Sequence, residues 1–275
     1  MMDMVLDSFA TLSFPLFVPA DRPDRFAKAC EAGTDSVIID LEDAVASDLK
    51  SAVRRIPRNA LPSDRTVTLM LRINAPGTQW YRDDVAFARA TNFDAVVLPK
   101  AETPEQIAEL RAALNPGQKI LGLVETVRGV ARMAELAEAT DRLAFGSIDL
   151  SADMGCENTH MAFLPIRSQI VQAARLAGRP APLDGVTTAT RDSEIIARDA
   201  RHSHEMGFGG KLLIHPAQIE PVRGAFRPAR ERVDWAERVV AASADGGAAL
   251  VDGAMVDVPV LKQALRVLDW ARALS

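Results

Sequence analysis

The segment Val37-Ile38-Ile39-Asp40-Leu41-Glu42-Asp43-Ala44-Val45 decides the fold. An apolar run ends abruptly in three carboxylates within four residues, which is typical of a buried strand that delivers acidic side chains to a site. The same design recurs at residues 120–126 and 142–149. Because the ends of parallel strands meet at one edge of a sheet, the repeated pattern predicts converging carboxylates and a divalent cation.

Eight apolar runs of strand length alternate along the chain with segments of helical spacing. The strands are predicted at residues 15–20, 36–43, 68–75, 94–101, 120–126, 142–150, 180–186 and 211–216. Eight successive βα units favour an α/β fold of the TIM (β/α)8 barrel type over a doubly wound sheet, which typically needs fewer strands.

The chain is predicted to divide into a catalytic barrel, residues 1–240, and a C-terminal extension, residues 241–275. Residues 241–253 are rich in alanine, glycine, serine and aspartate, which is typical of a flexible linker. Apolar side chains at helical spacing in residues 260–271 predict an amphipathic terminal helix. Since the barrel is already complete, we expect this extension to pack on a neighbouring subunit.

Composition excludes several classes of protein. The 275 residues are 48% hydrophobic and 25% charged, as in ordinary globular domains. The net charge is −5, and basic residues are not interleaved with aromatic ones, which argues against nucleic acid. No apolar run approaches the roughly 20 residues that span a bilayer. Cys30 and Cys156 lack metal-ligand spacing and are expected to be free thiols. We therefore expect a soluble, cytoplasmic protein with a small-molecule partner.

Nearly every predicted strand delivers a polar or charged side chain at its C-terminal end, where TIM barrels place their chemistry. In chain order these residues are Asp40, Glu42, Asp43, Arg72, Asn74, Lys100, Glu125, Asp149, Asp184 and His215. Any one of them, taken alone, is as readily explained as a solvated or ion-paired residue. Taken together they favour an active site.

Glu125 and Asp149 are the candidate metal ligands. Two carboxylates without a neighbouring histidine or cysteine suit Mg²⁺, which keeps several waters and binds through one or two carboxylates plus substrate oxygens. Asp40, Glu42 and Asp43 would then hold metal waters or orient the basic residues.

Arg72 is the candidate substrate-binding arginine. Its guanidinium has the geometry to bind a carboxylate or a polarised carbonyl, and the alternative is a structural ion pair with Asp40 or Glu42. We favour the functional role. Lys100 and Asp40 are expected to bind substrate beside Arg72, with Glu42 and Asp43 as further catalytic residues.

The histidines are weaker candidates. His215 is either a catalytic acid or the cap of a helix that begins at Pro216, and the cap is favoured. His202 and His204 are expected on the surface, and His160 is left open. The glycine-rich residues 207–211 precede a strand, the reverse of P-loop order, so they are expected to turn a helix into strand eight.

Residues 16–29 and 40–45, with Lys50 and Arg54, resemble the citrate lyase β-subunit-like family within the HpcH/HpaI aldolase superfamily. The resemblance continues in the family's order to about residue 273, through Arg72-Ile73-Asn74, Leu98-Pro99-Lys100, Val124-Glu125-Thr126, residues 145–150, residues 207–211 and residues 214–219. One departure is that Ser13-Phe14-Pro15 stand where family members usually carry an arginine before Leu16, which puts the usual substrate in doubt.

The resemblance implies a Mg²⁺-dependent barrel that cleaves or forms a carbon–carbon bond between an acyl thioester, on CoA or a carrier protein, and an α-keto acid. It also implies that Asp257, in residues 253–259, enters the active site of a neighbouring subunit in a homo-oligomer, a trimer by resemblance. The competing interpretations are a CoA-independent aldolase of hydroxy-keto acids and a non-catalytic metabolite-binding barrel.

Overall fold

The computed structural model describes residues 8–56, 60–62, 65–243 and 249–274. The chain divides into two compact units, the first ending at Val222 and the second beginning at Arg223. No described helix is long and apolar enough to cross a bilayer.

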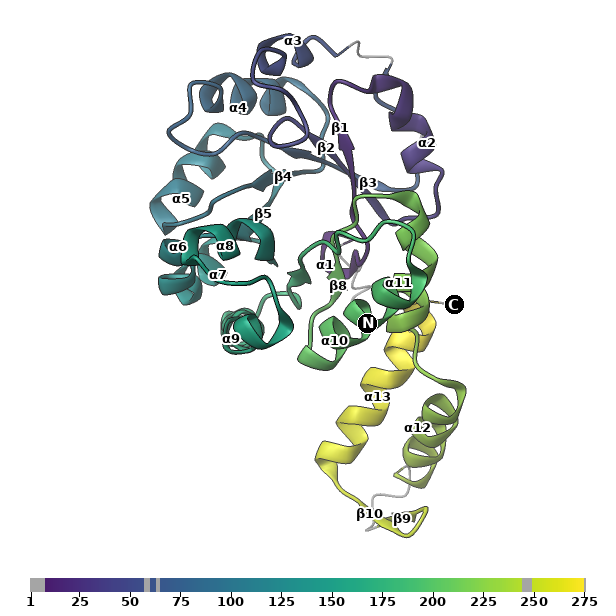
Figure 1. Ribbon diagram of the computed structural model, residues 1–275. Coiled ribbons are helices and arrows are strands. Elements are labelled where there is room, and N and C mark those ends of the chain that lie inside the picture. The colour runs from purple at the N-terminus through teal and green to yellow at the C-terminus, as the bar shows by residue number, and fades with distance from the viewer. Residues whose placement is uncertain (1–7, 57–59, 63–64, 244–248, 275) are drawn as a thin grey trace. The chain divides into compact units, whose positions relative to one another are not determined.

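The first unit is a parallel barrel of eight strands in sequential order (Figure 1). The strands are β1 (Leu16–Pro19), β2 (Ser36–Asp40), β3 (Thr68–Arg72), β4 (Ala95–Leu98), β5 (Lys119–Val124), β6 (Arg142–Phe145), β7 (Leu183–Asp184) and β8 (Gly210–Lys211). A parallel bridge between Leu16 and Leu213 joins the last strand to the first, with the Phe17 N–H donating to the Leu213 carbonyl at 2.8 Å. The TIM-barrel prediction is confirmed.

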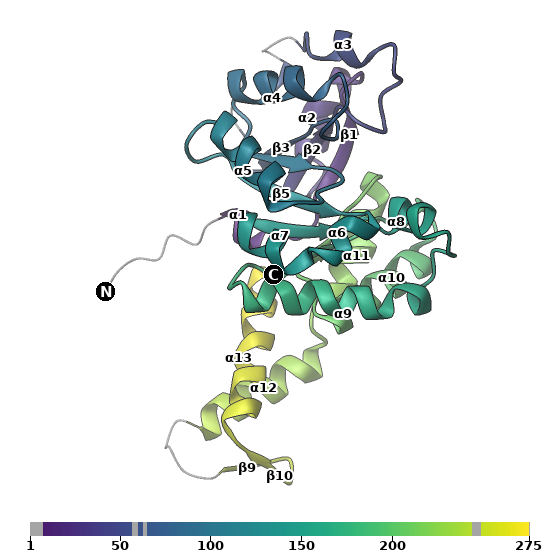
Figure 2. The same ribbon diagram turned by 90° about the vertical axis from the view of Figure 1, so that its left-hand side faces the viewer.

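Helices surround these strands (Figures 1 and 2). They are α1 (Ser8–Thr11), α2 (Phe26–Cys30), α3 (Lys50–Val53), α4 (Tyr81–Ala90), α5 (Pro104–Ala113), α6 (Val127–Ala131), α7 (Met133–Ala139), α8 (Ser147–Met154), α9 (His160–Leu176), α10 (Ser193–Met206) and α11 (Ile219–Phe226), with short 3-10 turns at Pro23–Arg25 and Pro216–Gln218. Helix α5 begins where the sequence places a cap, because the Thr103 side chain accepts from Gln106 N–H and the Gln106 side chain accepts from Thr103 N–H.

The barrel interior is filled by apolar side chains from alternating strand positions. Its core includes Ile38, Met70, Val97, Leu121, Leu123 and Leu212. Phe9 and Leu12, from and just after α1, belong to the same cluster, and the fully buried Arg142 holds this segment in place. The Arg142 guanidinium donates to the carbonyls of Leu12 at 2.6 Å, Ala181 at 2.7 Å and Phe9 at 3.3 Å. These contacts lie at the N-terminal ends of the strands, opposite the predicted site.

Several predicted strands extended too far toward their C-terminal ends. The largest error concerns residues 142–150, because β6 ends at Phe145 and Ser147–Met154 form helix α8. Gly146 begins the helix, and its carbonyl accepts from Leu150 N–H at 3.2 Å. Exposed Ile148 and buried Leu150 therefore belong to a helix, although their alternation resembles that of a strand. Asp149 lies in the first turn of this helix and does not close a strand.

The second unit contains α12 (Arg230–Ala242), the antiparallel hairpin β9 (Ala249–Val251) and β10 (Ala254–Val256), and α13 (Val258–Ala273). Ala236, Val239, Val251 and Ala264 form its buried core. The predicted terminal helix is confirmed. The linker prediction is wrong for its described part, because Ala242 still belongs to α12 and β9 begins at Ala249; residues 244–248 lie outside the described residues.

Candidate active site

Asp40 and Arg72 end two neighbouring strands, β2 and β3, at positions that face each other in the sheet register. Arg72 Nε donates to Asp40 Oδ1 and Arg72 Nη2 to Asp40 Oδ2, both at 2.7 Å. The Asp40 carboxylate also accepts the N–H groups of Glu42 at 2.8 Å and Ala44 at 3.1 Å. The structural ion pair considered as the alternative role for Arg72 is therefore present, and substrate binding by Arg72 remains a prediction.

Two further carboxylates surround the same guanidinium. Arg72 Nη1 lies 3.2 Å from Glu42 Oε2 and 3.2 Å from Asp43 Oδ2. Although burial acts against the charged form, these carboxylates and Asp40 raise the pKa of Arg72 above its usual value. Burial raises the pKa of Glu42 even though Arg72 lies beside it. Arg72 is thus held as a permanent cation beside residues 40–44, the acidic loop at the end of β2.

A buried lysine holds the backbone of this acidic loop, and sequence reasoning did not identify its role. Lys50 Nζ donates to the carbonyls of Leu41 at 3.1 Å and Glu42 at 2.6 Å, and to Asn74 Oδ1 at 2.6 Å. The Asn74 amide in turn donates to Asp84 Oδ2 at 2.6 Å. Asn74 was predicted at a strand end, whereas Lys50 entered only through the family resemblance, because nothing local in the sequence indicates that a lysine eight residues later reaches back to Glu42.

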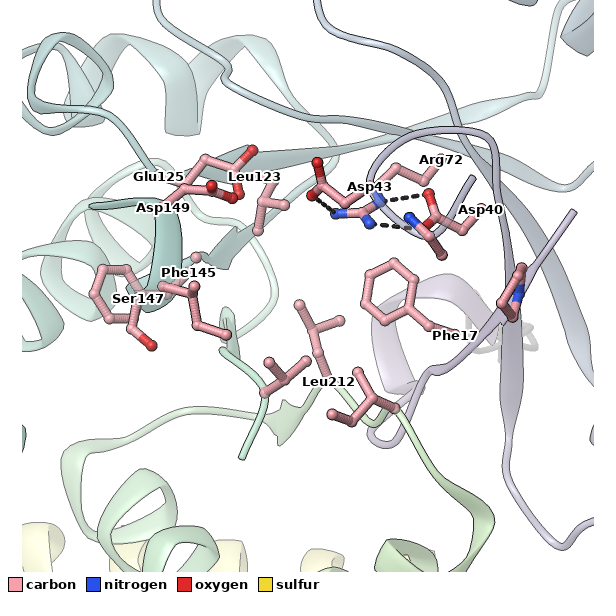
Figure 3. Close-up of a pocket in the computed structure, with 16 residues that line it drawn as sticks. Phe17, Asp40, Asp43, Arg72, Leu123, Glu125, Phe145, Ser147, Asp149 and Leu212 are labelled. Carbon is pink, nitrogen blue, oxygen red and sulfur yellow. Dashed lines mark hydrogen bonds and ion pairs between the residues drawn. The ribbon is translucent and has the colours of Figure 1, made fainter. Parts of the chain in front are cut away.

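Glu125 and Asp149 lie side by side at the mouth of the barrel, across from Arg72 (Figure 3). Glu125 directly follows β5 and is 2% exposed, whereas Asp149 is half-buried. Burial, followed by the charges of Glu42 and Asp149, raises the pKa of Glu125 well above its usual value. Two carboxylates held together in this way have a strong electrostatic reason to bind a cation.

The donor set fits a hard cation that keeps part of its water shell. Within the described residues, no group of three or more His, Cys, Asp or Glu side chains is placed to hold a metal ion. The pair of Glu125 and Asp149 is therefore not a complete protein cage, and an oxygen-only pair suits Mg²⁺ better than Zn²⁺. Space beside the pair is kept by Gly146, because a Cβ there would lie 2.5 Å from both Cβ and Oε2 of Glu125.

These side chains line a cavity of about 470 Å³ (Figure 3). Its charged lining residues are Asp40, Asp43, Arg72, Glu125 and Asp149, and its apolar ones include Phe17, Leu123, Phe145, Val186, Leu212 and Ile214. The Arg72 guanidinium lies over the Phe17 ring, 4.7 Å from its centre. The cavity lining thus combines the carboxyl pair of Glu125 and Asp149, the Arg72 cation with its neighbouring acids, and apolar side chains.

Lys100 lies beside the lining residues and contacts two of the candidate acids. Its Nζ donates to Glu42 Oε1 at 2.8 Å, and its backbone N–H donates to Glu125 Oε1 at 2.8 Å. The structure therefore brings together all the barrel residues predicted for the site: Asp40, Glu42, Asp43, Arg72, Lys100, Glu125 and Asp149. Asp257 belongs to the second unit, where its side chain accepts from Val260 N–H at 3.0 Å as the N-cap of α13; its role in a neighbouring site remains a prediction.

Asp184 and His215, two further residues predicted at strand ends, have structural contacts. Asp184 is buried beside Arg167 and Lys211, whose nitrogens lie 3.3 and 3.6 Å from its carboxylate.

The predicted turn into strand eight is confirmed, because Gly207 ends α10 with a φ of 94° and Lys211 lies in β8. His215 Nδ1 accepts from Ala217 N–H at 3.1 Å, which confirms the predicted cap.

Of the remaining side-chain predictions, the one for the cysteines is confirmed and the one for two histidines is wrong. Cys30 and Cys156 are free thiols, as predicted. The surface assignment of His202 and His204 is wrong, because both are half-buried on α10, where burial lowers the pKa of each. His160, left open from the sequence, lies 2.8 Å from Asp199 and stacks on His202.

Residues 13–216 match the HpcH/HpaI aldolase/citrate lyase family. The chain belongs to this family. A citrate lyase subunit beta-like protein of Mycobacterium tuberculosis is 42% identical over 267 residues, covering 93% of this chain and 94% of that protein. A (3S)-malyl-CoA thioesterase of Cereibacter sphaeroides is 32% identical, covering 94% of each chain.

The family assignment extends to three-dimensional structure. The crystal structure of CitE from Mycobacterium tuberculosis in complex with magnesium, acetoacetate and coenzyme A superposes with a TM-score of 0.84 and 40% identity, covering 96% of this chain and 99% of that one. The similarity therefore includes both units of the chain and not the barrel alone.

Proposed function

We propose that this protein is a Mg²⁺-dependent carbon–carbon lyase that cleaves, or in reverse forms, a 3-hydroxyacyl thioester, giving an acyl thioester and an α-keto acid. The observation that carries the proposal is the pairing of Glu125 and Asp149 on one side of the cavity with the fixed cation Arg72 on the other. The related CitE structure, which contains magnesium, a keto acid and coenzyme A, supports the same chemistry.

Glu125 and Asp149 would hold the metal, which when bound supplies Lewis-acid polarisation of a substrate oxygen. Arg72 would bind the keto-acid half, because a planar guanidinium fixes a carboxylate in one orientation. Donors fixed in advance toward developing negative charge are typically worth roughly 3–4 kcal/mol in the transition state. Asp40, Glu42 and Asp43 hold that guanidinium in place, so none of this orientation has to be acquired during the reaction.

A proton must also reach the α-carbon of the leaving acyl thioester after the bond breaks. Glu42 and Asp43 lie beside Arg72 but are engaged by Arg72 and Lys100. We propose that Asp257 of a neighbouring subunit, in a trimer, supplies this proton. A carboxylate from a second chain would approach the cavity without disturbing the network around Arg72.

Thioester hydrolysis is the second candidate, and the (3S)-malyl-CoA thioesterase of Cereibacter sphaeroides favours it because that relative covers almost the whole chain. The two reactions give different products from the same substrate. Carbon–carbon cleavage of malyl-CoA gives acetyl-CoA and glyoxylate, whereas hydrolysis gives malate and free CoA.

The experiment supplies malyl-CoA, citramalyl-CoA, citryl-CoA and then free hydroxy-keto acids, each with Mg²⁺ or with a chelator, and identifies products by mass spectrometry. A keto acid and an intact acyl-CoA, formed only with Mg²⁺, are the expected result. Free CoA with the intact hydroxy acid would replace the lyase by a thioesterase. Cleavage of free hydroxy-keto acids without CoA would indicate an aldolase, and turnover of none of these compounds would favour a metabolite-binding barrel.

A further inference from the structure

Lys100 has a backbone conformation that lysine rarely adopts. Its φ is +47°, and among the described residues only Asp252 shares a positive φ without being a glycine. Lys100 follows Pro99 in the turn that leaves β4. A turn with proline at its second position and a positive φ at its third ordinarily carries glycine or asparagine there. The lysine therefore occupies a position where glycine would be less strained.

The two ends of this lysine contact two different acids of the site. Its backbone N–H donates to Oε1 of Glu125, the candidate metal ligand, at 2.8 Å. Its ammonium donates to Oε1 of Glu42 at 2.8 Å. Glu42 is itself fixed, because its Oε2 lies 3.2 Å from Arg72 and its carbonyl accepts from Lys50. Lys100 thus connects Glu42, which pairs with Arg72, to Glu125 through hydrogen bonds at its two ends.

We propose that Lys100 is a positioning residue for the metal site: its ion pair with Glu42 holds the left-handed turn, and that turn fixes Oε1 of Glu125 through the Lys100 N–H. This role differs from the substrate contact that the sequence suggested. It rests on the proposed Mg²⁺ site at Glu125 and Asp149. The strained backbone persists because the surrounding contacts hold it, and the contact of the lysine ammonium with Glu42 is one of them.

The proposal is testable because the charge of Lys100 and its positioning of Glu125 predict opposite changes in metal affinity when the ammonium is removed. A lysine ammonium near a cation site repels the cation, so removing the ammonium should tighten metal binding if only charge matters. If Lys100 positions Glu125, removing the ammonium should weaken metal binding instead. Contacts that orient a metal ligand are typically worth about 10–100-fold in affinity.

The experiment measures Mn²⁺ affinity, as a spectroscopic substitute for Mg²⁺, by electron paramagnetic resonance on the purified full chain without substrate. Lys100→Met removes the charge and keeps the backbone strain, and Lys100→Gly removes both. We expect Lys100→Met to weaken Mn²⁺ binding by about tenfold, with a smaller loss for Lys100→Gly because glycine adopts a positive φ freely. Asp252→Gly, at the other positive φ, is the control and should leave the affinity unchanged.

An affinity of Lys100→Met equal to or tighter than that of the unmodified protein would overturn the proposal. If Lys100→Met does not fold, Lys100→Gly decides in the same way, since weaker binding supports positioning and equal or tighter binding refutes it. Glu125→Gln shows whether Mn²⁺ occupies the intended site, and unchanged binding in that variant would overturn the inference. Absence of lyase products with normal Mn²⁺ binding would count against the proposed function alone.

Discussion

Arg72 and Asp40 form a bidentate ion pair at the ends of neighbouring strands, with both nitrogen–oxygen distances at 2.7 Å. The pair is almost completely buried, because the side chain of Arg72 is 11% exposed and that of Asp40 is 1% exposed. Arg72 therefore has a fixed direction before any substrate arrives. That direction is the basis of the first prediction.

Arg72→Lys should lower kcat/KM by about 100-fold, because a lysine cannot hold Asp40 through two parallel hydrogen bonds and face a substrate carboxylate as well. It should also lower the free energy of unfolding by about 2 kcal/mol, the value of a lost charge-assisted hydrogen bond. Steady-state kinetics and urea denaturation measure the two effects. Arg111→Lys, at the half-exposed pair with Asp141, is the control and should change neither. An unchanged kcat/KM for Arg72→Lys would remove Arg72 from the mechanism.

Glu125→Gln and Asp149→Asn should each lower Mg²⁺-dependent turnover by about 1000-fold, equivalent to about 4 kcal/mol of lost metal assistance. Both replacements keep the size of the side chain, so circular dichroism spectra should not change. The control is Glu157→Gln, an exposed acid on the loop after α8. Full activity of the double variant in the presence of chelator would contradict the metal mechanism.

Asp257→Asn separates the cap of α13 from the proposed catalytic role. Asparagine caps a helix about as well as aspartate does, so stability should hold, while activity should fall if the carboxylate enters a neighbouring site. Mixing inactive Asp257→Asn subunits with inactive Glu125→Gln subunits should then restore part of the activity, because some interfaces pair an intact metal site with an intact Asp257. Mixed oligomers without any activity, or a fully active monomer, would exclude a shared site.

His202 should make the protein less stable in mild acid. Burial, and then the neighbouring His160, lowers the pKa of His202 below 6.5, so the folded chain binds fewer protons than the unfolded chain as the pH falls through that range. Stability is therefore present above the unfolded pKa and is lost as the pH decreases toward the folded pKa. In His202→Phe the ring can still stack on His160, and the melting temperature should decline less between pH 7 and pH 5. An identical decline in both proteins would show that other groups set the acid sensitivity.

Arg142→Met should destabilise the barrel without affecting catalysis. The guanidinium satisfies three backbone carbonyls, including those of Phe9 and Leu12, and its loss would leave buried acceptors unpaired. The expected cost is about 3 kcal/mol, measured by urea denaturation. Because Arg142 lies at the opposite end of the strands from the cavity, kcat/KM below the unfolding temperature should not change.

The barrel and most residues of the candidate site could be predicted because apolar runs, and the polar residues that follow them, are readable from sequence even where the exact end of a strand is not. Asp40 and Arg72 close apolar runs, and parallel strands carry such residues to one edge. Asp149 lies beside Glu125 as predicted but on a different element, since an apolar run of strand length does not reveal where a helix begins. The positive φ of Lys100 and the reach of Lys50 to Glu42 depend on tertiary contacts that no local pattern encodes.

One missed element did carry a local signal. Asp252 and Gly253 lie between β9 and β10 with φ values of 51° and 80°. Asp-Gly between two apolar segments is a strong hairpin signal, because both central residues of the favoured two-residue turn need positive φ. The surrounding alanines and glycines of residues 241–253 concealed it and favoured a linker.

Gly146 constrains how this protein can change over evolutionary time. Since any side chain at residue 146 would collide with Glu125, the glycine must be retained for as long as Glu125 keeps its position. A lineage that acquires alanine at residue 146 first loses the geometry of Glu125 while every charge of the pocket remains. The reverse order, loss of the acid followed by loss of the glycine, meets the same barrier, because a Cβ at residue 146 would also lie 2.5 Å from the Cβ of residue 125, which every amino acid except glycine carries. The constraint on residue 146 therefore comes from the backbone position of residue 125, and it would outlast the loss of the carboxylate itself.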